Sequence, residues 1–156
     1  MPSQYIPKRI TSYDVKEAMT VVDYGCGSGR FSAYFSSRVG ENGNVYAVDN
    51  SPVAIKNIEK MITSKKLTNI VPVLAKNNLC GLQDRVADRI FAIDMFHLID
   101  NPTQFLSELY RIIKRDGILF LEYGHQTKKE ALEKVAKADV FQMCEAQSKY
   151  IMCKPK

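Results

Sequence analysis

Short runs of β-branched and aliphatic residues alternate along the chain with longer stretches whose apolar positions recur at helical spacing. The runs that we expect to form strands are 21–24, 45–49, 69–75, 89–93, 118–123, 140–146 and 149–153. The stretches that we expect to form helices are 31–37, 53–66, 103–114 and 128–137. Strands that alternate with helices predict an α/β fold. We expect a doubly wound, seven-stranded, mostly parallel sheet with helices between its first five strands and an antiparallel C-terminal strand.

The length of the chain, 156 residues, is about that of one domain, and no linker, repeat or low-complexity segment divides it. We therefore expect a single domain over 1–156, in which 20–154 form the core. Pro72 interrupts the third predicted strand. Because proline has no amide N–H to donate, this strand should lie at or near an edge of the sheet.

The N-terminal segment, 1–19, is short and polar. Within it, 13–19 could form one or two helical turns. Tyr5 or Tyr13 could cover a ligand from here, but packing in the core is the interpretation that we favour for a tyrosine.

The stretch at 21–31 carries the strongest signal for a ligand. Its pattern is Asp23-x-Gly25-x-Gly27-x-Gly29. Glycines permit positive φ and let backbone N–H groups approach a ligand, and the helix that follows points its positive end at the turn. A dinucleotide fingerprint would need a glycine at position 30, where the chain has Arg30. The acid before the first glycine would pair with a ligand ammonium group and repel a pyrophosphate.

The next predicted strand also ends in an acid. Asp49 lies 20 residues beyond Gly29, and Ser51 and Pro52 then begin a helix. At this distance an acid at the end of the second strand accepts hydrogen bonds from ribose hydroxyls. A carboxylate can accept from both hydroxyls of a vicinal diol. The alternative is that Asp49 only caps its turn, and agreement with the glycine pattern favours the ribose.

These features resemble motif I and the acidic position after it in class I S-adenosylmethionine (SAM)-dependent methyltransferases. The resemblance covers about residues 20–154. It continues in Asp94-Met95-Phe96-His97, after the fourth predicted strand, and in a turn at 111–117 that follows a helix. Within that turn, Arg115 and Asp116 replace a proline and a glycine of the family pattern. The chain is most similar to the ubiquinone- and menaquinone-methylase-like group of this family.

The resemblance implies that the chain binds SAM and releases S-adenosylhomocysteine (SAH). The donor-binding residues that it implies are Asp23, Gly25, Cys26, Gly27, Gly29, Asp49, Asn50, Asn77, Asn78 and Asp94. Asp23 and the glycine turn would hold the methionine part and Asp49 the ribose. Asn77 or Asn78 would accept from the adenine amino group, at a position where the family has an acid. Asp94 would orient the donor's amino group, favour the donor's cation, or only cap its own loop.

His97 and His125, the two histidines of the chain, follow strands that should be neighbours in such a sheet. Methyl transfer needs an aligned acceptor and removal of its proton, and it requires no metal. We predict His97 as the catalytic base because a histidine titrates near neutral pH. A role in lining the wall by hydrogen bonding is the alternative. His125 is the weaker candidate, and we predict no metal ligand.

Composition adds few restrictions. The four cysteines form no C-x-x-C pair, so we expect no zinc site built from them. The net charge of +5 is mild, and no arginine-rich tract indicates nucleic-acid binding. No apolar run approaches the ~20 residues of a membrane span. Because the first residues also lack the features of a signal peptide, we expect a cytoplasmic protein without membrane contact.

The sequence favours a small-molecule acceptor, narrowly. The Asn-Pro-Pro-Tyr motif of enzymes that methylate amino groups of bases and glutamines is absent after the fourth strand. A nucleic-acid or protein acceptor stays open, because a short, open site also suits a large partner. The sequence also leaves open the possibility of a homo-oligomer in which a second copy covers the site. The other functional class is a SAM-binding subunit without catalysis of its own.

Overall fold

A computed structural model describes residues 6–156. Its elements, in chain order, are α1 (Lys8–Thr11), β1 (Thr20–Tyr24), α2 (Arg30–Val39), β2 (Asn44–Asp49), α3 (Pro52–Lys65), β3 (Ile70–Leu74), β4 (Ala87–Ala92), the 3₁₀ turn η1 (Phe96–Leu98), α4 (Pro102–Ile112), β5 (Ile113–Glu122), α5 (Lys128–Ala138), β6 (Phe141–Ala146) and β7 (Tyr150–Pro155). Within 6–156, no helix combines the length and the apolar character that a membrane span needs.

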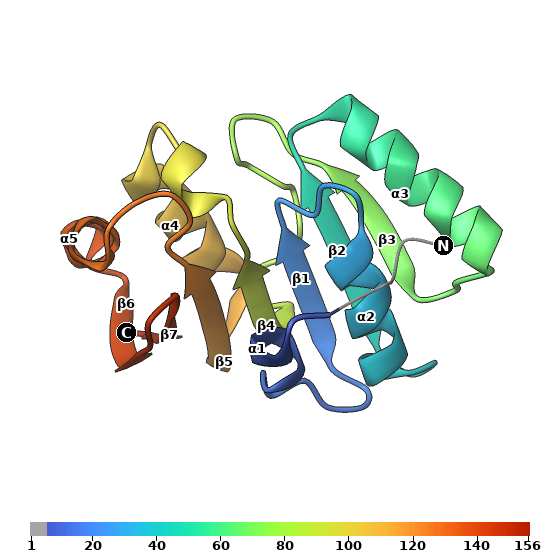
Figure 1. Ribbon diagram of the computed structural model, residues 1–156, viewed down its shortest axis with the longest axis horizontal. Coiled ribbons are helices and arrows are strands. Elements are labelled where there is room, and N and C mark those ends of the chain that lie inside the picture. Colours follow the sequence, from blue (N-terminus) through green and yellow to red (C-terminus); the bar gives the residue numbers. More distant parts are fainter. Residues whose placement is uncertain (1–5) are drawn as a thin grey trace.

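All seven strands belong to one sheet with the order β3-β2-β1-β4-β5-β7-β6 (Figure 1). Strands β1 to β5 run parallel, whereas β7 lies antiparallel between β5 and β6. The predicted doubly wound, mostly parallel sheet with an antiparallel C-terminal strand is therefore confirmed. The strand that contains Pro72, β3, lies at one edge, as expected from its missing amide donor. The order reverses between β1 and β4, the point at which open α/β sheets bind ligands.

Two apolar layers hold the helices against the sheet, because successive residues of a strand point to opposite faces. On one face, Ile90 and Leu119 pack with residues of α4 and α5. On the other face, Phe91 and Phe120 pack with residues of α1, α2 and α3. The rings of Phe91 and Phe120 stack with centroids 4.9 Å apart. The alternating pattern of the sequence thus assigns each helix to its face.

The predicted helical turns at 13–19 are wrong, and the N-terminal helix is α1 instead. Tyr13 and Val15 are both buried while Asp14 between them is exposed, which is the spacing of extended chain rather than helix. Asp14 holds this course by its ion pair with Arg89, at 2.9 Å. Tyr13 is 6% exposed and its ring lies 4.4 Å from that of Phe120, so it packs in the core. Tyr5, the other tyrosine considered, lies outside the described residues.

The expected turn at 111–117 is also wrong, because α4 ends at Ile112 and β5 begins at the next residue. Gly117 lies inside β5, where a Cβ would lie 2.6 Å from the Ile113 side chain and 3.1 Å from the Ala87 carbonyl oxygen of β4. A bulge in the register between β4 and β5 accompanies this close approach. The glycine therefore allows close packing within β5 and against β4, and does not end a helix.

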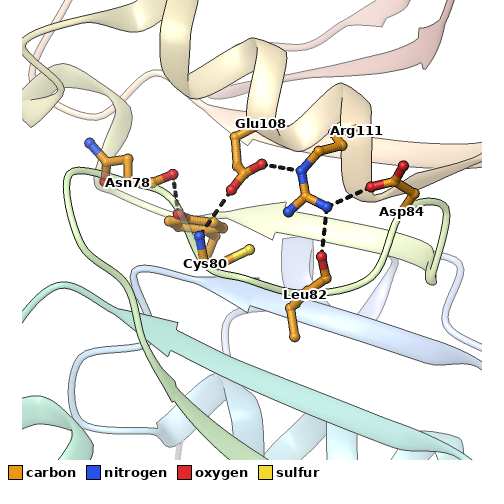
Figure 2. Close-up of polar contacts among 7 residues, drawn as sticks. Asn78, Cys80, Leu82, Asp84, Glu108 and Arg111 are labelled. Atoms are coloured by element: carbon orange, nitrogen blue, oxygen red, sulfur yellow. Dashed lines mark hydrogen bonds and ion pairs between the residues drawn. The ribbon is translucent and has the colours of Figure 1, made fainter.

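The connection from β3 to β4 contains no helix, contrary to the expectation for the first five strands. In place of a helix, this connection is a loop that two charged residues of α4 hold by hydrogen bonds (Figure 2). Glu108 accepts from the backbone N–H of Cys80 at 2.9 Å and from the Arg111 guanidinium. Arg111 donates in turn to the Leu82 carbonyl oxygen at 2.6 Å and to Asp84 at 2.7 Å. Backbone groups of the loop are satisfied in this way by side chains instead of by a helix.

We predict that Arg111→Met destabilises the protein by roughly 1–3 kcal/mol. The substitution leaves Glu108, which is 6% exposed, without its charged partner. Breaking a fully buried ion pair costs about 3–5 kcal/mol, and the effect is smaller here because the Arg111 side chain is 34% exposed. Urea denaturation measures the loss, and hydrogen exchange should show faster exchange over 76–86.

The matched control is Arg115→Met, which removes an exposed arginine four residues further along the chain. It should change the free energy of unfolding by less than about 0.5 kcal/mol. Equal effects of the two substitutions would contradict the role of Arg111 in holding the loop.

Candidate functional site

A cavity of about 830 Å³ lies beyond the carboxyl ends of β1, β2 and β4. Its walls come from three places: the start of the glycine turn, the end of β2 with the loop after β3, and residues between Asp94 and Gln104, of which His97 is not one. Carboxyl ends of parallel strands meet at one edge of the sheet, so residues far apart in the sequence surround the same space. Tyr24 lines it too, and its hydroxyl donates to the Asn78 carbonyl oxygen at 2.6 Å.

The glycine turn has the conformation that its sequence predicts. Gly25, Gly27 and Gly29 have φ values of 81°, 52° and 85°, a region that favours glycine. The reason for a glycine is clearest at Gly29, where a Cβ would lie 2.4 Å from the Ile58 side chain. The start of α2 can therefore pack against α3 only without a side chain at this residue. Backbone N–H groups of Gly25 and Cys26 donate to the Val48 carbonyl oxygen at 2.7 Å and 3.0 Å.

Asp49 fixes this turn to the end of β2. One carboxylate oxygen accepts from the Gly27 N–H at 3.0 Å, and the other accepts from the Ser51 N–H at 2.9 Å. Each oxygen keeps further acceptor capacity, because a carboxylate has about four lone-pair sites. Asp49 also lines the cavity. The acid is thus held rigidly by two backbone groups while it faces the space where a ligand would lie.

Asp23 lies behind the turn. It is 2% exposed, accepts from the Ser32 hydroxyl at 2.6 Å, and does not line the cavity wall. Burial raises the pKa of Asp23 to about 6; the Ser32 hydrogen bond opposes this shift and the charge of Asp49 adds to it. The carboxyl group therefore changes its charge near neutral pH. Cys26 is buried in the core, so only its backbone takes part in the turn.

The three asparagines that the sequence analysis named form the next part of the wall. Asn50 and Asn78 bond to each other, with 2.7 Å between the Asn50 Nδ2 and the Asn78 Oδ1. Asn77 and Asn78 both have positive φ, 51° and 60°. Asn77 is exposed, whereas Asn78 is half-buried. Asn78 is therefore already engaged with Asn50, and Asn77 presents its amide to the cavity more freely.

The two histidines lie side by side at the neighbouring ends of β4 and β5. The rings of His97 and His125 are 4.9 Å apart at an angle of 86°. Gly124 makes the space for this contact, because a Cβ at this residue would lie 2.0 Å from the His97 Nδ1. The His97 Nδ1 is buried and has no hydrogen-bond partner among residues 6–156. Asp94 belongs to the same group: its carboxylate and one nitrogen of each ring lie within 4.8 Å of one another.

A second cavity, of about 360 Å³, lies on the other side of Asp94. Asp94 lines both cavities, and His125 lines the second one. Glu122, in its wall, is 5% exposed and accepts from the Arg9 guanidinium at 2.7 Å. Sequence analysis missed this pair. The acid at the end of a central strand was a usable signal for Glu122, but nothing local indicates that Arg9 reaches it across 113 residues.

Comparison with known proteins places this geometry in a family. A family model described as a methyltransferase domain matches residues 15–154. Ribosomal protein L11 methyltransferase of Anoxybacillus flavithermus is 33% identical over 119 residues, which are 76% of this chain and 36% of that protein. The chain spans about a third of the length of the first curated relatives that it matches.

Solved structures of methyltransferases are similar to this one. A SAM-dependent methyltransferase from Aquifex aeolicus superposes with a TM-score of 0.81 at 26% identity, over 93% of this chain and 87% of that one. Coclaurine N-methyltransferase bound to N-methylheliamine and SAH gives a TM-score of 0.62 at 30% identity, over 74% of this chain and 32% of that one. The ubiquinone- and menaquinone-methylase-like group stays a prediction. The family match over 15–154 and the sheet order together show that the chain belongs to the methyltransferase-domain family of class I, SAM-dependent methyltransferases.

Proposed function

We propose that this protein transfers a methyl group from SAM to a small-molecule acceptor. The observation that carries the proposal is the cavity of about 830 Å³ with the fixed carboxylate of Asp49 in its wall. A cavity of this size accommodates a ligand as large as the donor. Family membership supplies the donor, and the position of the cavity at the reversal of strand order supports its binding there.

Each part of the donor is bound by a different group of the predicted residues. Asp49 accepts from the two ribose hydroxyls with its remaining lone pairs. Asn77, with Asn78 as the alternative, accepts from the adenine amino group. The glycine turn lies against the methionine part, and the buried charge of Asp23 attracts its ammonium group through the turn. Asp94 lies where the two cavities meet, near the sulfonium of a donor bound in this orientation.

The acceptor binds in the second cavity, of about 360 Å³, on the far side of Asp94. Its nucleophilic atom attacks the methyl carbon in line with the bond to sulfur. The new bond to carbon forms as the carbon–sulfur bond breaks, and the sulfur keeps that electron pair, so SAH leaves as a neutral thioether. His97 takes the proton that the acceptor loses, because an imidazole beside this cavity can act as a general base.

The second cavity favours a small polar acceptor. Arg9 and Glu122 neutralise each other in its wall, and Lys128 and Lys149 add positive charge. A compound with an anionic group would match these lysines. Among the relatives, one is named for a ribosomal protein and another was solved with N-methylheliamine, so the family alone does not decide the acceptor. A nucleic-acid or protein acceptor, or a donor-binding subunit that needs a partner, is the alternative.

Asp49→Ala should weaken SAH binding by roughly 10²- to 10⁴-fold in titration calorimetry. The substitution removes hydrogen bonds from a charged acceptor to the ribose, each of which contributes about 1.5–3 kcal/mol. Asp116→Ala, an exposed acid of β5, is the control and should bind SAH as the wild type does. Unchanged SAH binding by Asp49→Ala, with its melting temperature retained, would contradict the proposed donor site.

Affinity for SAM should decrease as the pH falls through 6, by up to ~10-fold per pH unit below that value. The cationic donor favours ionised Asp23, and protonation of this carboxyl group, whose pKa is about 6, removes the attraction. Calorimetry between about pH 5 and 8 measures the dependence. Asp23→Asn should bind more weakly at pH 8 and lose most of the dependence.

The same carboxyl group gives a separate signature in the donor-free protein. Its folded pKa lies above the ordinary value of 3.8, so the folded state binds more protons than the unfolded state between about pH 4 and 6. The contribution of Asp23 to stability is therefore present below this window and is lost as the pH rises through it. Asp23→Asn should remove this component from denaturation curves. A wild-type slope of donor affinity that persists in Asp23→Asn would exclude Asp23 as its cause.

His97→Gln should lower kcat by roughly 10²- to 10⁴-fold and leave SAH binding within about twofold of the wild type. The assay follows labelled methyl transfer from SAM to a panel of small amines, thiols and hydroxyl compounds, with and without cell lysate and in the presence of EDTA. Transfer that occurs only when lysate is added to the protein would favour the alternative function, a donor-binding subunit without catalysis of its own. Full activity of His97→Gln in EDTA would contradict its role as a base.

A further inference from the structure

Asp94, His97 and His125 form a cluster of metal-ligating side chains that the sequence analysis did not expect. Each offers one ligand atom, and these atoms lie within 4.8 Å of one another. Around a tetrahedral Zn²⁺ with bonds of 2.0–2.2 Å, ligand atoms are about 3.5 Å apart. Asp94 and His125 are exposed, so rotation of their side chains can close the difference. His97 is the half-buried member that would anchor the ion.

The fold brings these three residues together for reasons independent of their chemistry. Asp94 and His97 follow β4, and His125 follows β5, the next strand of the sheet. Gly124, whose φ is 67°, leaves room for the His97 ring. Two histidines and one carboxylate are a donor set that first-row transition metals bind with open positions left for other ligands, and two of the three, Asp94 and His125, line the second cavity.

Within residues 6–156, the cluster lacks the hydrogen bonds that hold histidines with a purely structural role. Histidines that only line a wall are held by hydrogen bonds, but the buried Nδ1 of His97 has no partner among the described residues. The two rings meet edge to face, and neither donates a hydrogen bond to the other among the bonds present. The unpartnered nitrogen of His97 is therefore the observation that points to a ligand for this group.

We propose that Asp94, His97 and His125 bind one divalent first-row transition metal ion, with Zn²⁺ or Fe²⁺ as the best match to two imidazoles and a carboxylate. The positive groups of the same cavity are Arg9, Lys128 and Lys149, of which Arg9 is paired with Glu122. Binding therefore depends on direct ligation and not on a negative field. This site follows from the residues themselves and does not require the proposed transferase activity.

The use of such an ion in catalysis does rest on the proposed function. Three protein ligands leave at least one position open toward the second cavity, which His125 and Asp94 line. An acceptor hydroxyl or thiol bound at that position would lose its proton to solvent more readily, because a divalent cation stabilises the anion. His97 would then act as a ligand, and its role as a base would belong to the metal-free protein.

Titration calorimetry of the EDTA-stripped full chain with ZnCl₂ tests the site directly. We expect one Zn²⁺ per chain, confirmed by elemental analysis after desalting, and visible d–d bands when Co²⁺ is added instead. His125→Ala should weaken Zn²⁺ binding by more than ~10-fold, since even an outer-sphere partner of a metal ligand costs 10- to 100-fold. This residue is exposed, so the variant should fold. Asp94→Asn should act in the same direction.

Cys144→Ser is the matched control, because Cys144 is an exposed free thiol and thus the competing Zn²⁺ ligand. It should bind Zn²⁺ as the wild type does. The proposal is overturned if Zn²⁺, Co²⁺ and, without oxygen, Fe²⁺ all fail to bind with 1:1 stoichiometry, or if Zn²⁺ binding survives His125→Ala. Calorimetry with SAH on the same metal-free protein keeps the two proposals apart: donor binding without metal binding overturns only the metal site, and metal binding without donor binding overturns only the proposed function.

Discussion

The pair of hydrogen bonds at Asp49 is the constraint on which the rest of the site depends. The carboxylate accepts from the backbone of Gly27 on one side and from Ser51 on the other, and so joins the turn after β1 to the start of α3. Without these two hydrogen bonds, the glycines of the turn would keep more conformational freedom, and the Asp49 side chain would not be fixed in one orientation. The same carboxylate faces the large cavity, so the bonds that stabilise the turn also preorganise the group that we assign to the ribose.

Asp94 lies between two cavities of different character. The larger one is walled by asparagines, backbone and the segment after β4, and the smaller one by charged side chains from β5, α1 and the final hairpin. A transfer reaction needs two ligands that meet at one point, and an arrangement of two spaces with one shared residue provides such a point. The shared residue also belongs to the cluster of Asp94, His97 and His125, which places ligand-type side chains at that junction.

The sequence predicts those parts of the structure that local patterns determine. The glycine turn, the acid that ends β2, the Ser-Pro start of α3 and the edge position of Pro72 each follow from neighbouring residues and are present in the structure. The failures concern contacts between distant residues. Glu108 and Arg111 replace a helix in the β3–β4 connection, and Arg9 reaches Glu122 across the sheet. No local pattern encodes either contact. The close approach of the two histidine rings depends on Gly124, because a side chain at this residue would occupy the place of the His97 ring.

A crystal structure of the protein with SAH bound tests the central claim most directly. The account predicts SAH in the larger cavity, with both ribose hydroxyls within hydrogen-bonding distance of the Asp49 carboxylate and the sulfur directed toward Asp94. Electron density for SAH elsewhere on the molecule, or in this cavity with its ribose turned away from Asp49, would contradict it.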